Sequence, residues 1–127
     1  MEEKMPKKLP PSLRTKKRYI VFEIISEHPV EYIDFVNAFW DSMLSLSGEL
    51  GSSENNVWII QNLYDKKNQR GVIRCRHDRV EYVRSSLASM QIIGESKSIV
   101  RIPGVTGTVK SARSKYLGFR NLRDFSE

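Results

Sequence analysis

The stretch RYIVFEII, residues 18–25, decides the fold class, because a run of β-branched and aromatic residues is typical of a strand. Residues 30–46 follow with apolar side chains at helical spacing, and Pro29, Glu31 and Asp34 suit the start of a helix. The expected apolar stripe of this helix consists of Ile33, Val36, Trp40 and Met43, widened by Phe35, Phe39 and Leu46. The chain is therefore predicted to open with a strand and an amphipathic helix.

The rest of the chain continues this alternation. Residues 51–56 are predicted to be a polar loop, and residues 57–64 and 71–77 to be two strands joined by the hairpin loop DKKNQR. A second helix is expected over residues 79–92, since Asp78 and Glu81 have capping-box spacing and Gly94 suits a helix end. Residues 96–103 are predicted to form a fourth strand, and residues 108–117 a short basic helix. The core-facing positions expected in these helices are Val80, Val83, Leu87 and Met90, then Val109, Ala112, Tyr116 and Leu117.

The order βαββαβ with a trailing helix predicts an α+β protein of the ferredoxin-like sandwich type. Its four-stranded antiparallel sheet would carry two helices on one face and leave the other face open, a plan that RNA-recognition domains use. This single domain is assigned to residues 18–117, between a basic extended arm (residues 1–17) and a C-terminal tail (residues 118–127). Because the same architecture hosts many functions, function must come from particular residues.

Size and composition exclude several classes of protein. At 127 residues the chain is expected to hold one core, and its apolar runs stay far below the ~18 residues of a membrane span. No apolar segment follows the basic N-terminus, so no signal peptide is expected. The single cysteine, Cys75, forms neither an intramolecular disulfide nor a cysteine-based zinc site, which favours a reduced, cytoplasmic location.

Charge is strongly segmented along the chain, although the net charge is only +6. Residues 1–18 hold seven basic and two acidic side chains, whereas residues 19–64 hold seven acidic side chains and no lysine or arginine. Residues 65–127 hold fourteen basic and six acidic side chains. A surface made only for solubility would mix the signs. We therefore expect one region that faces phosphates and another that faces something else.

The third predicted strand can be compared with RNA-recognition strands, which carry a basic residue, a glycine and then aromatics that stack on bases. Arg70 and Gly71 match the first two positions, but the aromatics are missing, so base stacking on this sheet is not expected. Strand alternation places Arg74 and Arg76 on the face opposite Ile73. Two interpretations of these arginines stay open: contacts to RNA phosphates and sugars, or solvation and pairing with nearby acids.

Basic side chains gather at both ends of the chain. They are Lys7, Lys8, Arg14, Lys16, Lys17 and Arg18 in and next to the proline-interrupted arm, and Lys110, Arg113 and Lys115 in the last helix. Because the two clusters occur together, we interpret them as RNA-binding rather than as solubilising tails. The glycine-containing loop 104–108 has the composition of a phosphate-binding loop, but a glycine turn with a threonine cap is the favoured interpretation.

No catalytic or metal site is predicted in this chain. His28 and His77 lack the spacing of zinc ligands, and no nucleophile elbow, Walker loop or dinucleotide fingerprint occurs. The acids Glu31, Asp34 and Asp41 fall in one helix and are interpreted as its solvent face. No cofactor is therefore expected to be bound by the chain itself.

Four strings of residues carry a family resemblance: LPPSLRTKKRYI (residues 9–20), GELG (48–51), GVIRC (71–75) and GVTGTVKSARSKYL (104–117). In this order they resemble the archaeal ribonuclease P protein component 2 family, the Pop-five subunits. The first and last strings are the specific ones, whereas GELG alone would be weak. The resemblance covers residues 9–117, and residues 118–127 match no pattern of the family.

The resemblance implies a non-catalytic protein subunit of ribonuclease P, an endonuclease whose RNA removes the 5′ leader from precursor tRNA. The chain would bind and support that RNA, and Mg²⁺ would act with the RNA. The implied partners are the ribonuclease P RNA, protein component 3, the other protein subunits and, in the holoenzyme, precursor tRNA. Two copies of the chain per assembly are implied.

A protein partner fits the acidic segment, and Trp40 and Trp58 are predicted to contribute to that protein interface. The domain's own core is the alternative place for both tryptophans. The alternative function is a ribosome-associated or tRNA-binding protein of the same fold. An autonomous nuclease or a small-molecule regulatory domain is a more distant alternative, and predicts activity or ligand binding without RNA.

Overall fold

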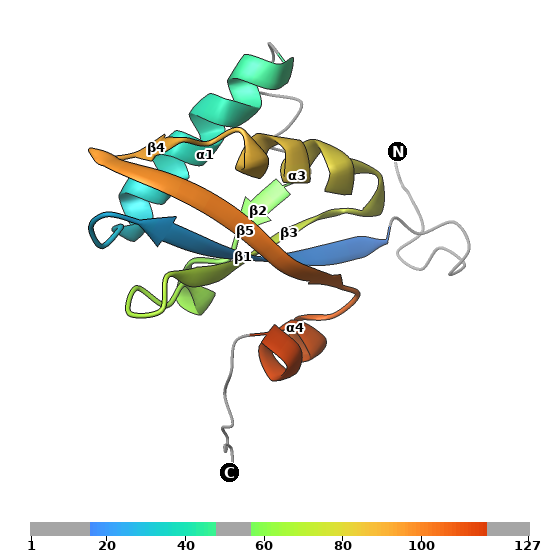
Figure 1. Ribbon diagram of the computed structural model, residues 1–127. Helices are drawn as coiled ribbons and strands as arrows, with labels where there is room; N and C mark the ends of the chain where they lie inside the picture. The colour runs from blue at the N-terminus through green and yellow to red at the C-terminus, as the bar shows by residue number, and fades with distance from the viewer. Residues whose placement is uncertain (1–15, 48–56, 117–127) are drawn as a thin grey trace, which may run out of the picture.

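A computed structural model describes residues 16–47 and 57–116 (Figure 1). The predicted loop 51–56, most of the basic arm and the tail 118–127 lie outside the described residues. The elements in chain order are β1 (Lys17–Ser26), α1 (Tyr32–Ser47), β2 (Val57–Ile59), the 3₁₀ helix η2 (Gln61–Leu63), β3 (Arg70–Arg76), the 3₁₀ helix η3 (His77–Arg79), α3 (Val80–Ala88), β4 (Ile92–Ile93), β5 (Ser96–Thr106) and α4 (Val109–Tyr116). In this part of the chain, no helix has the length and apolar character needed to cross a membrane.

The strands form one curled antiparallel sheet in the order β2-β3-β1-β5-β4. Strand β1 lies at its centre, with Val21 opposite Val72 of β3 and Tyr19 opposite Thr106 of β5. The predicted combination of helices with an antiparallel sheet is confirmed. The predicted number of four strands is wrong, because β4 pairs with β5 and adds a fifth strand at the edge.

Helices α1 and α3 cover one face of the sheet, the inner face, and enclose the main core (Figure 1). A column of aromatic rings organises this core: the centroids of Phe22 and Phe35 are 4.4 Å apart, and those of Phe35 and Phe39 are 6.0 Å apart. Tyr64 closes the column 6.3 Å from Phe22. Burial of these large rings removes much apolar surface from water and supplies a major part of the stability.

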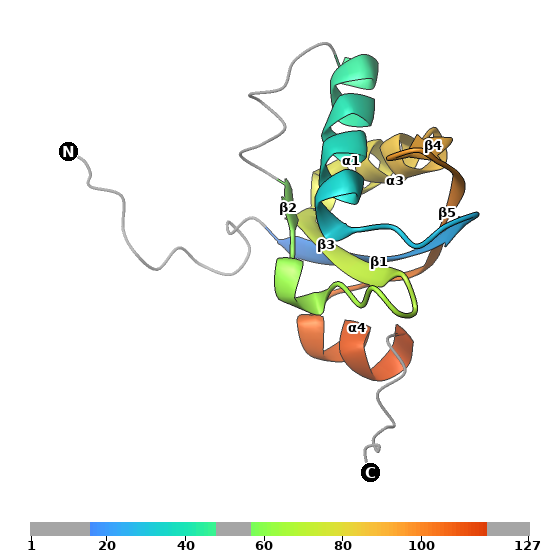
Figure 2. The same cartoon turned by 90° about the vertical axis from the view of Figure 1, so that its left-hand side faces the viewer.

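Helix α4 packs on the opposite face of the sheet, the outer face (Figure 2). Val21, Val72 and Ala112 form a second, fully buried cluster there, and Tyr19 and Tyr116 pack against it. The prediction of an open second face is therefore wrong for the area beneath α4. Only the part of the outer face beyond this cluster is available to a ligand.

The stripe that α1 buries differs from the predicted one, although the helix itself begins and ends close to the predicted positions. Phe35, Phe39 and Met43 are fully buried, whereas Ile33 and Leu46, both expected in the stripe, are 59% and 50% exposed. Residues at i, i+4 and i+8 therefore face the sheet. The displaced apolar residues remain on the surface of α1.

The second predicted helix is shorter than expected. It ends as α3 at Ala88, and Ile92, expected at the end of the helix, forms β4 with Ile93 instead. Gly94 was expected to cap the helix, but it makes the turn between β4 and β5 with φ of +63°, a conformation that glycine adopts without strain. Two β-branched residues before such a turn favour a hairpin over another helical turn.

Strand β2 is also shorter than predicted, because the residues after Ile59 bury their side chains on both faces of the sheet. Ile60 and Leu63 pack with the cluster beneath α4, while Tyr64 returns to the inner core. The chain therefore turns through η2 instead of extending to residue 64. The loop DKKNQR does close as predicted, because Asp65 and Arg70 form a bridge.

Strand β5 runs three residues beyond its predicted end, so Gly104 and Thr106 belong to the strand. Residues 107 and 108 alone therefore connect β5 to α4. The backbone N–H of Ser111 donates to Oγ1 of Thr108 at 3.1 Å, which confirms the threonine cap of the favoured interpretation.

Candidate nucleic-acid interface

The predicted RNA-binding residues fall in the basic arm and the start of β1, in β3 and in α4. Lys7, Lys8 and Arg14 lie outside the described residues. Lys16 directly precedes β1, and Lys17 and Arg18 begin it. Arg74 and Arg76 lie in β3, and Lys110, Arg113 and Lys115 lie on the exposed surface of α4. Arg18 is half-buried opposite Cys75, on the inner side of the sheet, and donates to the carbonyl of Lys17 at 2.9 Å. It is therefore the described candidate that fits an outer binding face least well.

The predicted orientation of β3 is confirmed. Ile73 and Cys75 are fully buried in the inner core, so Arg74 and Arg76 project from the outer face. Arg76 Nη2 lies 2.9 Å from Oδ2 of Asp78, so for this residue pairing with an acid is realised. The predicted capping box at Asp78 is wrong, because α3 begins without a side-chain cap.

A tryptophan lies among the cations of β1 and β3. Trp58 is opposite Arg74, and Lys17 is opposite Arg76, so all four side chains project from the outer face. The guanidinium carbon of Arg74 lies 4.4 Å from the centroid of the Trp58 ring, and Nζ of Lys17 lies 5.4 Å from it. These are distances of cation–π contacts. We call Lys17, Trp58, Arg74 and Arg76 the tryptophan–arginine patch.

Trp40 and Trp58, predicted to contribute to one protein interface, project on opposite sides of the sheet. Trp40 is half-buried on α1, with its ring centroid 5.2 Å from that of Phe39. Sequence reasoning missed Trp58 as a neighbour of the basic residues. Strand alternation could have placed Trp58 on the outer face, because Val57 and Ile59 face the inner core, but its position beside Arg74 depends on the register of β2 with β3.

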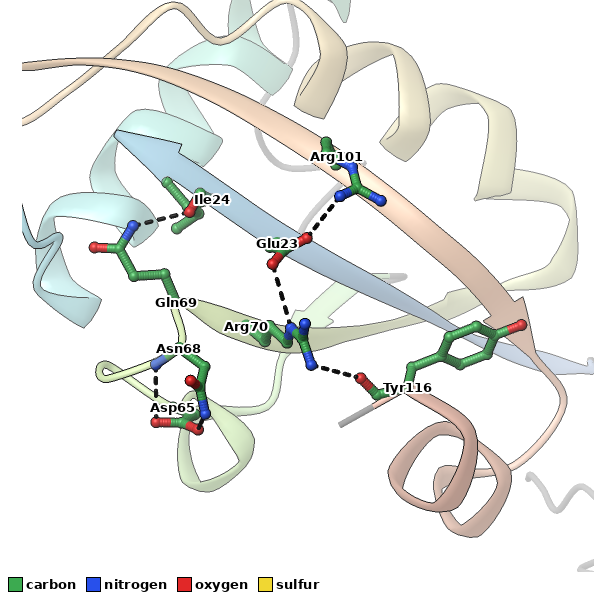
Figure 3. Close-up of polar contacts among 8 residues, drawn as sticks. All are labelled: Glu23, Ile24, Asp65, Asn68, Gln69, Arg70, Arg101 and Tyr116. Atoms are coloured by element: carbon green, nitrogen blue, oxygen red, sulfur yellow. Dashed lines mark hydrogen bonds and ion pairs between the residues drawn. The ribbon is translucent and has the colours of Figure 1, made fainter. Parts of the chain in front are cut away.

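Helix α4 is held on the outer face by a chain of polar contacts at its last turn (Figure 3). Glu23 of β1 binds Nη1 of Arg101 at 3.0 Å and Nε of Arg70 at 3.4 Å. Arg70 Nη1 then donates to the carbonyl of Tyr116 at 3.3 Å. The Tyr116 ring lies over Gly104 of β5, where a Cβ atom would be 2.3 Å from ring carbon Cζ. The glycine thus makes room for the helix.

The first turn of α4 lies toward the tryptophan–arginine patch. Strand β5 ends at Thr106, which pairs with Tyr19, and Tyr19 pairs with Arg74. Because α4 begins three residues after Thr106, Lys110 in its first turn lies at the patch end of the helix. Exposed cations therefore continue from the sheet along α4, an arrangement that suits a polyanionic backbone.

The glycine of the Arg70-Gly71 motif has a structural role. Gly71 lies opposite Phe22, and a Cβ atom at Gly71 would be 2.5 Å from ring carbon Cζ of Phe22. Arg70 is used to hold α4, as described above. The first two positions of the motif therefore maintain the fold around both faces of the sheet.

A second surface, acidic and apolar, lies along α1 and the sheet edge. Helix α1 carries no lysine or arginine. A groove of about 630 Å³ between α1 and β4 is lined in part by Asp34, Asp41, Leu46 and Ile92. Ile92 also borders a hollow on the outer face with Ile25 and Ile99, whose exposed fractions are 50% and 63%. Exposed apolar residues that gather in this way are typical of protein-contact surfaces.

The reactive side chains of the described residues do not gather into a catalytic site. No group of three or more His, Cys, Asp and Glu side chains is gathered there as for a metal ion. Burial, together with the charge of Asp78, raises the pKa of the Cys75 thiol to about 11, so the thiol stays protonated at neutral pH. His28 and His77 are exposed; His28 lies in the connection between β1 and α1, and His77 begins η3.

Comparison with known proteins identifies a family. The sequence profile of the Rpp14/Pop5 family matches residues 18–117. The chain is 42% identical over 117 residues to ribonuclease P protein component 2 of Thermococcus kodakarensis, which covers 92% of this chain and 95% of the relative. The proteins of the same name from Pyrococcus furiosus and Methanocaldococcus jannaschii are 40% identical over 112 residues (88% and 92% covered) and 36% identical over 116 residues (91% and 84% covered).

The fold also has a counterpart among solved structures. A chain of the cryo-EM structure of yeast ribonuclease MRP superposes with a TM-score of 0.56 at 14% sequence identity, covering 75% of this chain and 76% of that chain. The family match extends from β1 to α4 and includes the residues that form the inner core, the α4 anchor and, apart from Lys17, the tryptophan–arginine patch. The chain belongs to the Rpp14/Pop5 family.

Proposed function

We propose that the chain is a protein subunit of ribonuclease P that binds and supports the catalytic RNA during removal of the 5′ leader from precursor tRNA. The observation that carries the proposal is that Lys17, Arg74 and the basic helix α4 share one face in a member of the Rpp14/Pop5 family. Cations held on one rigid face suit contacts to phosphates, which position a protein on folded RNA. The names of the relatives support the same role.

Catalysis is assigned to the RNA. In this proposal Mg²⁺ binds the RNA, and the chain itself binds no cofactor. Its basic side chains lie near phosphates and offset repulsion that would otherwise require more metal ion. The burial of Cys75 and the separation of the two histidines support a non-catalytic role for the described residues.

The acidic and apolar surface along α1 and β4 is proposed to bind protein: component 3 of ribonuclease P, in an assembly with two copies of each and with the other subunits. The carboxylates of Asp34 and Asp41 repel RNA phosphates, whereas exposed Leu46 and Ile92 suit an apolar partner. Trp40 lies on the same helix, half-buried, and belongs to this proposed interface.

The proposal extends to the architecture and the location. Strands β1, β2, β3 and β5 with helices α1 and α3 occur in the βαββαβ order expected of a ferredoxin-like domain, and β4 and α4 are additions. This order and the layers in Figure 1 support a ferredoxin-like plan. Processing of precursor tRNA would place the chain in the cytoplasm.

RNA association of the tagged full-length chain separates this function from that of a ribosome-associated or tRNA-binding protein, which would share the basic face. RNA and proteins that co-purify with the chain are identified by sequencing and mass spectrometry. Ribonuclease P RNA together with component 3 is the expected result. Recovery of ribosomal RNA, with ribonuclease P RNA absent, would overturn the proposal.

A further inference from the structure

Trp58 is a large aromatic side chain that the fold leaves 39% exposed on the edge strand β2, next to Arg74 and Lys17. It is not part of the cluster beneath α4, and its strand neighbours Val57 and Ile59 face the inner core. Its ring contacts the Arg74 guanidinium and lies near the Lys17 ammonium. Exposing an indole in water is unfavourable, so its position calls for an explanation beyond folding.

The positive charge of Arg74 is not neutralised by an acidic side chain of the described residues. No carboxylate there forms an ion pair with it, in contrast to Arg70, Arg76 and Arg101. Its Nε atom is shielded and has no hydrogen-bond partner. The indole holds the guanidinium in place, and no acidic side chain of the described residues pairs with its terminal N–H groups.

We propose that Trp58, Arg74 and Lys17 form a binding site for one unpaired nucleotide of RNA. The inference rests on the proposed RNA-binding function and adds the chemical class of the ligand at this site. The base stacks on the exposed part of the Trp58 indole, and its phosphate pairs with the Lys17 ammonium and the terminal N–H groups of Arg74. Stacking needs no particular base, because every base has a π-face.

This inference reverses the sequence-based expectation that the sheet stacks no base. That expectation considered only the residues of β3, which carries no aromatic side chain. The aromatic comes instead from β2, through the pairing of Trp58 with Arg74. An unpaired nucleotide fits better than a duplex, because bases inside an A-form helix present no open face to an indole.

The test uses the full-length chain with Trp40→Phe, which leaves Trp58 as the single tryptophan of the sequence. Fluorescence of Trp58 is titrated with a single-stranded oligoribonucleotide, the matching RNA duplex and inorganic polyphosphate. The single strand is expected to quench Trp58 strongly. Equal quenching by polyphosphate, which has charge but no base, would overturn the inference.

Substitution of Trp58 provides the second arm. Trp58→Leu is expected to weaken single-strand binding about 5- to 150-fold without changing its salt dependence, because no cation is lost, and Trp58→Phe is expected to retain most of the affinity. Ile33→Ala, which removes an exposed apolar side chain of α1 on the other side of the sheet, is the control and should bind RNA normally. Thermal unfolding of each variant verifies that it is folded.

The outcomes distinguish this inference from the proposed function. If Trp58→Leu binds the single strand as tightly as the unsubstituted chain, while ribonuclease P RNA still binds, only the nucleotide site is wrong. If Trp58→Leu loses component 3 but retains RNA, Trp58 belongs to a protein interface and the inference is again wrong. Failure of the unsubstituted chain to bind ribonuclease P RNA would instead contradict the proposed function.

Discussion

At the scale of single residues, the ionisation of Tyr64 makes the stability of the core depend on pH in the alkaline range. Its hydroxyl donates to the carbonyl of Val30 at 2.7 Å. Burial, reinforced by the charges of Glu31 and Asp65, raises the pKa of Tyr64 from 10.0 to about 12. Between these values the unfolded chain releases the phenolic proton while the folded chain keeps it, so the free energy of unfolding falls as pH rises from about 10 to 12.

Tyr64→Phe tests this coupling by chemical denaturation at a series of pH values. The variant lacks the hydroxyl, so we expect lower stability at neutral pH and a weaker fall in stability between pH 10 and 12. Tyr19→Phe, which changes a phenol on the other face, is the control and should keep the fall. Identical pH dependence in Tyr64→Phe and the unsubstituted chain would contradict the assignment.

The alternation of side chains along β3 leads to a second prediction for single residues. Ile73→Ala removes a fully buried side chain and should lower the free energy of unfolding by about 2–5 kcal/mol. Arg74→Ala with Arg76→Ala should leave the fold intact and lower RNA affinity, while binding of component 3 persists. Denaturation and RNA titration measure the two effects. Loss of component 3 with RNA affinity retained would reverse the assignment of the faces.

The orientation of β3 was predictable from sequence, whereas its neighbours were not. Alternation alone places Ile73 and Arg74 on opposite faces. That Trp58 lies beside Arg74 depends on strand register, which arises from tertiary packing and leaves no local signal in the sequence. The candidate basic residues could thus be named in advance, but the aromatic among them could not.

At the scale of elements, the position of α4 depends on the absence of a side chain at Gly104. A Cβ atom there would lie 2.3 Å from the Tyr116 ring, so Gly104→Ala must displace the last turn of α4. We expect a loss of about 1–3 kcal/mol in the free energy of unfolding, as for overpacked cores, together with weaker RNA binding. Gly107→Ala is the matched control, since no atom lies within 4 Å of its Cβ position.

The double variant Gly104→Ala with Tyr116→Ala makes the prediction sharper. Removing the ring relieves the overlap, so adding Tyr116→Ala should cost much less in the Gly104→Ala background than in the unsubstituted chain. Thermal and chemical denaturation of the four proteins give the coupling energy. Additive effects would show that the ring and the glycine do not interact.

The helices and strands differed in how well they could be predicted from the sequence. Strand β1 and helix α1 were predictable, because their apolar periodicities are long and distinct. The end of α3 was not, since Met90 continues the helical apolar pattern although the chain has already left the helix toward β4. The strand predicted in place of β2 was too long for a related reason. The apolar residues of this segment pack in two cores, and one strand pattern cannot represent both.

At the scale of the whole molecule, the outer face with α4 is basic and the surface along α1 is acidic and apolar. If the outer face and the basic segment before β1 bind the RNA backbone, Lys→Ala at Lys16, Lys17, Lys110 or Lys115 should weaken RNA binding. Each should also reduce the slope of log K against log salt by about 0.7 to 1 per lost contact. Lys66→Ala is the control, because Lys66 already pairs with Glu31 away from this face. Unchanged slopes in all four variants would show that these lysines do not contact RNA.

The central claim is that this chain assists a catalytic RNA, and reconstituted cleavage of precursor tRNA tests it most directly. The rate of 5′ leader removal is measured at limiting Mg²⁺ with ribonuclease P RNA and component 3, with and without the full-length chain. We expect the complete chain to raise the rate, the Arg74→Ala, Arg76→Ala variant to raise it less, and protein without RNA to show no cleavage. Leader removal by the protein alone, or a rate that the chain does not change, would contradict the claim.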